Sequence, residues 1–149
     1  MKKTVLRFLI LISITALTAC RDYHTSLSEA EAIPIAIKLE LNKAYDDTDP
    51  FVNEKLFIVT EDLDALTAKG TITLDGEHVK VEVKNNKTKD VLWNREYKGK
   101  VMAEDFSLSL KNLKAGDEYV VCMTGTRIER ALLELSFDSI LVQERERPA

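Results

Sequence analysis

The fold is decided by the stretch Phe106-Ser-Leu-Ser-Leu-Lys-Asn-Leu-Lys-Ala-Gly-Asp-Glu-Tyr-Val-Val121. Its first apolar residues, Phe106, Leu108 and Leu110, alternate with polar residues, which is typical of a strand with one buried face. The residues Lys-Ala-Gly-Asp that follow predict a turn, and a second apolar strand begins at Tyr119. Two such strands on either side of a short turn predict a β domain with antiparallel strands.

Strand patterns recur on both sides of this stretch. They predict strands over 33–41, 55–59, 71–74, 78–84 and 90–98 before it, and over 130–143 after it. Asp75-Gly76 predicts a tight turn, and a change of phase near Asp138 predicts a bulge in the last strand. Short strands at this spacing predict a two-layer antiparallel sandwich.

One segment predicts a helix. Thr60 suits an N-cap, Asp62 suits the first turn, Lys69 suits the last turn, and Gly70 stands where a helix ends. We therefore expect one short helix at about 61–69 within the otherwise all-β domain.

The stretch 106–121 also resembles part of a known family of domains. Leu113, Gly116 and Tyr119 match the L-x-x-G-x-x-Y pattern of fibronectin type III and other immunoglobulin-like domains, and the similarity extends over 77–122. The resemblance implies an immunoglobulin-like sandwich in which the tyrosine hydroxyl bonds to nearby backbone and pins the corner. The segment 42–70 has no counterpart in a minimal module of that family.

A jelly-roll sandwich is the alternative fold. The stretch Phe137-Asp-Ser-Ile-Leu-Val142 is similar to the last strand of carbohydrate-binding jelly rolls, where an aspartate often precedes alternating apolar residues. Neither fold fixes a function, because both host many.

The first twenty residues have the pattern of a secretory signal. A basic head containing Lys2, Lys3 and Arg7 precedes a short apolar run over 8–17, and Thr18 and Ala19 are small. The run is shorter than the roughly 20 apolar residues that a membrane span needs.

The end of this signal, Leu-Thr-Ala-Cys20, resembles the lipobox of bacterial lipoproteins. The resemblance implies cleavage after Ala19 and lipid on Cys20, which would hold the protein on a cell membrane; two or more chains anchor stably. We expect a signal peptide at 1–19, a lipidated cysteine and tether at 20–32, a β domain at 33–143 and a charged tail at 144–149. Arg21 after the cysteine favours the outer membrane where the cell has one.

The charge of the chain limits the kinds of partner it can bind, and its cysteine content predicts the state of Cys122. The chain has a net charge of −4, which becomes −7 when the three basic residues of the signal are removed. An acidic domain argues against nucleic acid as a partner. With Cys20 lipidated, Cys122 is the one remaining cysteine, and its apolar neighbours predict a buried thiol.

No catalytic motif stands out, so we expect neither an enzyme nor a cofactor. The loop residues Asp46, Asp47 and Asp49 are candidate calcium ligands, but a solvated acidic loop is the favoured interpretation and no metal is predicted. Trp93 and Tyr97 could form a sugar-stacking platform, although core packing is favoured. Tyr45 is a further candidate for ligand contact.

These observations predict a non-enzymatic, membrane-anchored lipoprotein. Its expected role is a binding or accessory subunit with a protein partner in the cell envelope. A surface lipoprotein that binds carbohydrate is the alternative, and a periplasmic enzyme inhibitor is a lesser one.

Overall fold

The domain consists of seven strands. The computed structural model describes residues 33–43 and 50–146, which belong to the compact unit Glu31–Ala149. The strands are β1 (Ala36–Asn42), β2 (Phe51–Val59), β3 (Leu63–Asn85), β4 (Val91–Lys98), β5 (Val101–Leu113), β6 (Glu118–Phe137) and β7 (Val142–Arg145). Within these described residues no helix has the length and apolar character needed to cross a membrane.

All seven strands form one open antiparallel sheet, which is built on the two longest of them. β3 pairs with β6 from Ala68 opposite Phe137 to Asn85 opposite Tyr119. The first half of β3 also pairs with β5, and its second half pairs with β4. Likewise β1 pairs with the second half of β6, and β2 pairs with its first half. β7 adds to the free side of β2.

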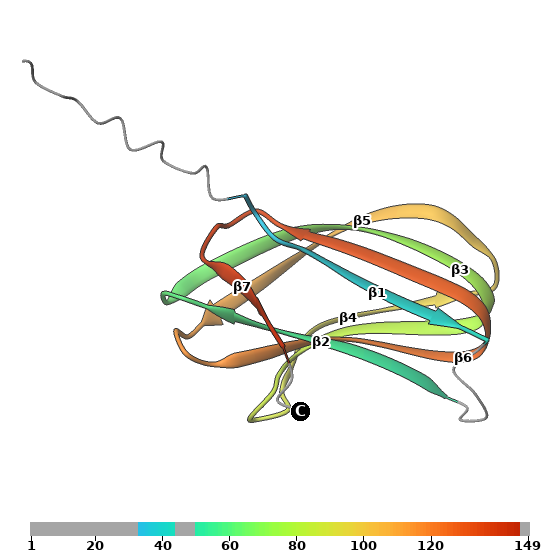
Figure 1. Cartoon of the computed structure of the whole chain (residues 1–149), viewed down its shortest axis with the longest axis horizontal. Helices are drawn as coiled ribbons and strands as arrows, with labels where there is room; N and C mark the ends of the chain where they lie inside the picture. Colours follow the sequence, from blue (N-terminus) through green and yellow to red (C-terminus); the bar gives the residue numbers. More distant parts are fainter. Residues whose placement is uncertain (1–32, 44–49, 147–149) are drawn as a thin grey trace, which may run out of the picture. The chain divides into compact units, whose positions relative to one another are not determined.

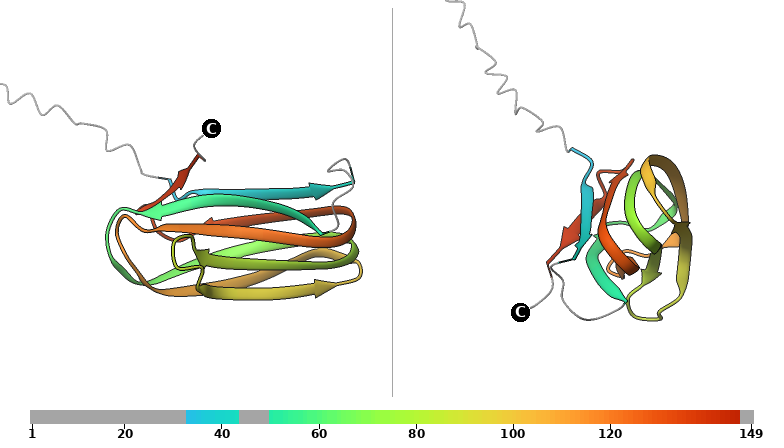
Figure 2. Two further views of the ribbon diagram at one scale, coloured as in Figure 1. Left: turned by 90° about the horizontal axis from the view of Figure 1, so that it is seen from below. Right: turned by 90° about the vertical axis from the view of Figure 1, so that its right-hand side faces the viewer.

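The sheet folds over on itself, so that its two halves face each other across the core (Figures 1 and 2). One half contains β1, the second half of β6, the first half of β3 and β5. The other half contains β7, β2, the first half of β6, the second half of β3 and β4. Aromatic contacts join the halves: the ring of Phe57 on β2 lies 4.9 Å from that of Phe137 on β6. The all-β prediction is confirmed.

Two glycines allow the central strands to bend together. A register shift interrupts the β3–β6 ladder at Asp75 and Gly76. A Cβ atom at Gly76 would lie 2.8 Å from the backbone oxygen of Arg127, and one at Gly125 would lie 2.5 Å from Ile128 Cγ1. The backbones of β3 and β6 therefore approach too closely at Gly76 for a side chain, whereas the space beside Gly125 is filled by the Ile128 side chain.

The predicted helix at 61–69 is wrong. Residues from Leu63 onward belong to β3, where Leu66, Ala68 and Gly70 alternate as buried positions with exposed neighbours. This segment pairs with β5, and from Ala68 it also pairs with β6. Tertiary pairing therefore overrides the local signals for helix ends, as it commonly overrides propensity.

One expected turn, and the expected strand 130–143 with its bulge near Asp138, also differ from the structure. Asp75-Gly76 forms a bulge within a continuous β3 instead of a hairpin turn. The expected strand 130–143 is divided, because the chain turns after Phe137 and resumes as β7, which continues to Arg145. The N–H of Thr67 donates to Asp138 Oδ1 at 3.1 Å, and the N–H of Asp138 donates to the Thr67 oxygen at 3.0 Å, so this turn is fixed to β3.

We expect Gly76→Ala to lower the free energy of unfolding by about 1–3 kcal/mol, because the new methyl group meets backbone that cannot rotate away. The measurement is urea unfolding followed by Trp93 fluorescence. Lys69→Ala, an exposed position on the same strand, is the control and should change stability little. Equal stability of the two variants would contradict the close approach.

Candidate functional site

The structure describes two of the seven residues singled out for binding or modification within the mature chain. Trp93 and Tyr97 both lie on β4. Cys20, Tyr45 and the acidic residues Asp46, Asp47 and Asp49 lie outside the described residues. Among the residues that are described, no group of three or more His, Cys, Asp or Glu side chains is placed to hold a metal ion.

Trp93 and Tyr97 pack between the two halves of the sheet, at the side where β4 faces β5. The indole ring of Trp93 stacks on Phe106 with centroids 5.4 Å apart and planes 9° apart. The centre of the Tyr97 ring lies 6.2 Å from that of Phe106, and the Tyr97 side chain is only 4% exposed. A ring buried to this extent offers no face to a sugar, so only the half-buried Trp93 keeps any surface for ligand contact.

An ion pair covers this aromatic group. Arg95 Nη2 lies 2.6 Å from Glu104 Oε1, and the guanidinium carbon lies 5.1 Å from the centre of the Tyr97 ring. The Tyr97 hydroxyl is buried and makes no hydrogen bond to any described residue. Burial raises the pKa of Tyr97, so the phenol stays neutral at physiological pH.

The outward face of the half-sheet containing β5 carries two neighbouring hollows. One, of about 540 Å³, is polar and is lined by Lys69, Thr71, Asp105, Ser107, Glu134 and Ser136. The other, of about 530 Å³, lies beside Met102 and Leu132, with Lys100 and Arg130 at its rim. In the first hollow, Thr71 Oγ1 donates a hydrogen bond to Asp105 Oδ1 at 2.6 Å.

A bulge in β5 exposes the methionine of the second hollow. Ile72 faces Glu104 and Leu74 faces Val101, so Met102 and Ala103 together oppose one residue of β3. Ala103 adopts a φ of 50°, which is uncommon for a residue with a side chain. Met102 is 82% exposed as a result. Sequence reasoning missed this residue, because a bulge depends on the register between strands.

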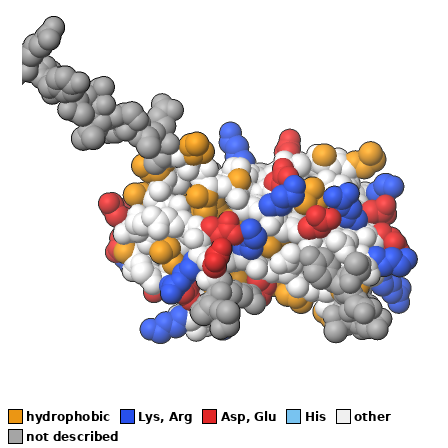
Figure 3. Space-filling view, viewed as in Figure 1, with side chains coloured by type: hydrophobic (Ala, Val, Ile, Leu, Met, Phe, Trp, Pro, Cys, Tyr) orange, Lys and Arg blue, Asp and Glu red, His pale blue; other side chains and the backbone are white. Residues whose placement is uncertain are grey.

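The remaining surface mixes charges of both signs. In the face drawn in Figure 3, cationic and acidic side chains are interleaved and not gathered by sign. Several lie in pairs across strands, such as Lys38 with Glu134 at 3.0 Å and Arg130 with Glu40 at 3.2 Å. Such exposed pairs contribute little stability, and they leave no broad basic surface on this face.

Cys122 is buried, as its neighbours predicted. It is 3% exposed, and its sulfur lies 3.7 Å from the Thr124 hydroxyl. Burial raises the pKa of the Cys122 thiol. A buried, protonated thiol is a poor nucleophile.

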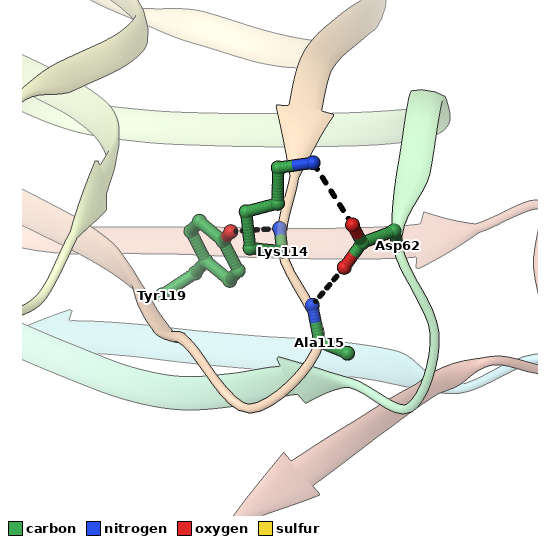
Figure 4. Close-up of polar contacts among 4 residues, drawn as sticks. All are labelled: Asp62, Lys114, Ala115 and Tyr119. Carbon is green, nitrogen blue, oxygen red and sulfur yellow. Dashed lines mark hydrogen bonds and ion pairs between the residues drawn. The ribbon is translucent and has the colours of Figure 1, made fainter.

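The corner between β5 and β6 has the predicted tyrosine contact. The backbone N–H of Lys114 donates to the Tyr119 hydroxyl at 2.7 Å (Figure 4). Leu113 is buried beside it, and Gly116 adopts a φ of 81°, which favours glycine. The hydrogen bond implied by the L-x-x-G-x-x-Y resemblance is therefore confirmed.

Asp62, in the turn between β2 and β3, binds to this corner. Its Oδ1 accepts a hydrogen bond from the Ala115 N–H at 2.8 Å, and its Oδ2 lies 2.9 Å from Lys114 Nζ (Figure 4). The Ala115 hydrogen bond, followed by the Lys114 contact, lowers the pKa of Asp62. The same contact raises the pKa of Lys114. No local signal in the sequence indicates a partner 53 positions away.

Comparison with protein families places the chain in one of them. The family model described as a domain of unknown function (DUF4624) matches residues 20–149, and the chain belongs to that family. No curated protein matches the chain.

We expect Asp62→Ala to destabilise the domain in a pH-dependent way. Because folding lowers the pKa of Asp62, its contribution is fully present above the carboxyl's unfolded pKa of about 4. The contribution decreases as the pH falls toward the folded pKa. Urea unfolding of wild type and variant should therefore differ at pH 7 and converge in acid. Glu61→Ala, at the exposed position before Asp62, is the control. A difference that persists undiminished in acid would contradict the ionic contact.

Proposed function

We propose that this protein is a bacterial lipoprotein, anchored to a membrane by lipid on Cys20, that serves as a non-enzymatic binding or accessory subunit of the cell envelope. The observation that carries the proposal is the tripartite signal ending in Leu-Thr-Ala-Cys20. The family match begins at Cys20, the residue that cleavage after Ala19 would leave first. Arg21 supports the outer membrane as the destination where one exists.

The surface of the described residues supports a binding role. Exposed Met102 stands beside an apolar hollow, and methionine adapts to partner surfaces because its side chain is flexible and polarisable. β-Bulges often mark places where a side chain is redirected for function.

The order of strand pairing supports a jelly roll over an immunoglobulin-like sandwich. To compare topologies, the strands are numbered again in chain order, with β3 and β6 each counted as two strands at their bends. One half-sheet then has the strand order first, eighth, third, sixth. The other half-sheet has the order second, seventh, fourth, fifth, with β7 added at its edge. This interleaving is that of a double-sheet jelly roll. We therefore infer the jelly-roll type for this domain.

The same inference favours a second candidate, a surface lipoprotein that binds carbohydrate, because carbohydrate-binding jelly rolls share this architecture. The aromatic side chains argue against it. Tyr97 is buried and one face of Trp93 is covered by Phe106, and stacking on sugar needs an open ring. Binding to a protein is therefore the primary proposal.

Replacing Cys20 tests the anchor. We expect Cys20→Ala to release the protein from the membrane fraction and to abolish incorporation of labelled palmitate, because no lipid can then be attached. Cys122→Ala is the matched control and should remain anchored. A mature protein whose N-terminal peptide, read by mass spectrometry, lacks a lipid-modified Cys20 would contradict the proposal.

Cross-linking in isolated membranes tests the binding role. We expect a protein partner to be recovered repeatedly with the wild-type chain and less often with Met102→Asp, which places charge beside the apolar hollow. Lys87→Asp, on the exposed loop after β3, controls for the added charge. A glycan array should give no signal. Binding to glycans with a change in Trp93 fluorescence, and no protein partner, would favour the second candidate.

A further inference from the structure

β5 presents a long strand edge that no described strand covers. It pairs with β3 on one side and with no other strand in the part of the chain that is described. Its regular segment is bounded by Ala103, with a φ of 50°, and by Asn112, with a φ of 56°. Between these two irregular positions, eight residues from Glu104 to Lys111 follow a straight ladder opposite β3.

The other sheet edges carry features that discourage pairing. On β5 such features, the bulge at Ala103 and the inward Glu104, lie only outside its centre. β7 has four residues, β1 follows Pro34 closely, and β4 holds the charged Arg95 on its inward side. Short length, proline and inward charge are the usual protections of an edge. The central stretch of β5, Phe106-Ser-Leu-Ser-Leu110, contains none of them and no charge.

We propose that two copies of this chain associate through β5, pairing antiparallel about a two-fold axis at Leu108. In that register Asp105 of one copy faces Lys111 of the other, and Ser107 faces Ser109. Each pair occurs twice because the interface is isologous. Main-chain hydrogen bonds between the two β5 edges then join the two half-sheets into one continuous sheet.

The charges on the outward face of β5 favour this register over its neighbours. Asp105, Ser107, Ser109 and Lys111 all lie on the outward face of β5, and all four are exposed. Moving the axis to Ser107 places Asp105 opposite Ser109 and brings Ala103, in the bulge, opposite Lys111. Moving it to Ser109 places Lys111 opposite Ser107 and Asp105 opposite Leu113. Of these, only pairing about Leu108 sets opposite charges face to face, which is the favourable cross-strand arrangement.

Pairing about Leu108 also keeps the apolar side chains on the correct side. Phe106, Leu108 and Leu110 are buried in the core of their own copy. In the proposed register, Phe106 of one copy lies opposite Leu110 of the other on this inner face, so the two cores meet side by side. The small Ser107 and Ser109 side chains leave the outer approach to the backbone open.

Paired cysteines test the geometry. In the full-length chain purified in mild detergent, a mixture of Ser107→Cys and Ser109→Cys copies carrying different tags should form a mixed disulfide under mild oxidation. Directly opposite strand residues have Cα atoms about 4.5–5.5 Å apart, which suits a disulfide. Copies with Lys38→Cys and Glu40→Cys on β1 are the control. Equal cross-linking on β1, or none on β5, would overturn the proposal.

Charge reversal tests the register independently, with analytical ultracentrifugation as the measurement. Lys111→Asp should weaken dimerisation roughly tenfold, since two cross-strand attractions become repulsions. The double variant Asp105→Lys with Lys111→Asp should restore it. A chain that stays monomeric at every concentration, or a dimer insensitive to Lys111→Asp, would overturn the proposal and leave a strand from a different protein as the occupant of this edge. Near-ultraviolet circular dichroism confirms that each variant is folded.

Discussion

The pairing of β3 with β6 is the constraint on which the rest of the sheet depends. These two strands run beside each other through both half-sheets, and β1, β2, β4 and β5 each attach to one of them. Because both strands continue from one half-sheet into the other past the register shift at Asp75 and Gly76, the half-sheets fold together as one unit. A change that moved one bend along its strand would put buried side chains on the wrong face beyond that point, since side chains alternate with a period of two.

Where an interaction is local, the sequence predicted it well. The corner at Leu113, Gly116 and Tyr119 is an example, because the tyrosine hydroxyl finds its partner at Lys114, only five positions away. The alternation of apolar residues in β5 and in the second half of β3 likewise predicted strands with one buried face. In these segments the side-chain pattern and the tertiary structure require the same conformation.

The sequence failed where a residue's role depends on a distant strand. Gly70 resembles a helix terminus, yet it is buried in β3 because the ring of Phe106 occupies the space where a Cβ would lie. The glycine of Asp75-Gly76 resembles a turn residue, yet it permits close contact with β6. Trp93 and Tyr97 were correctly placed on one face of β4. That this face turns toward Phe106 follows only from the folding of the sheet.

The pairing of β1 has a consequence for how the chain acquires its structure. Ala36 pairs with Ser136, so the first strand obtains its partner only when almost the whole domain has been made. Folds dominated by such distant pairings have high contact order and fold slowly. During that interval Ile37, Leu39 and Leu41 form an apolar stripe without a sheet to cover it, and exposed stripes of this kind promote aggregation. Lys38 and Glu40 lie on the opposite face, and charged side chains beside an apolar strand oppose aggregation.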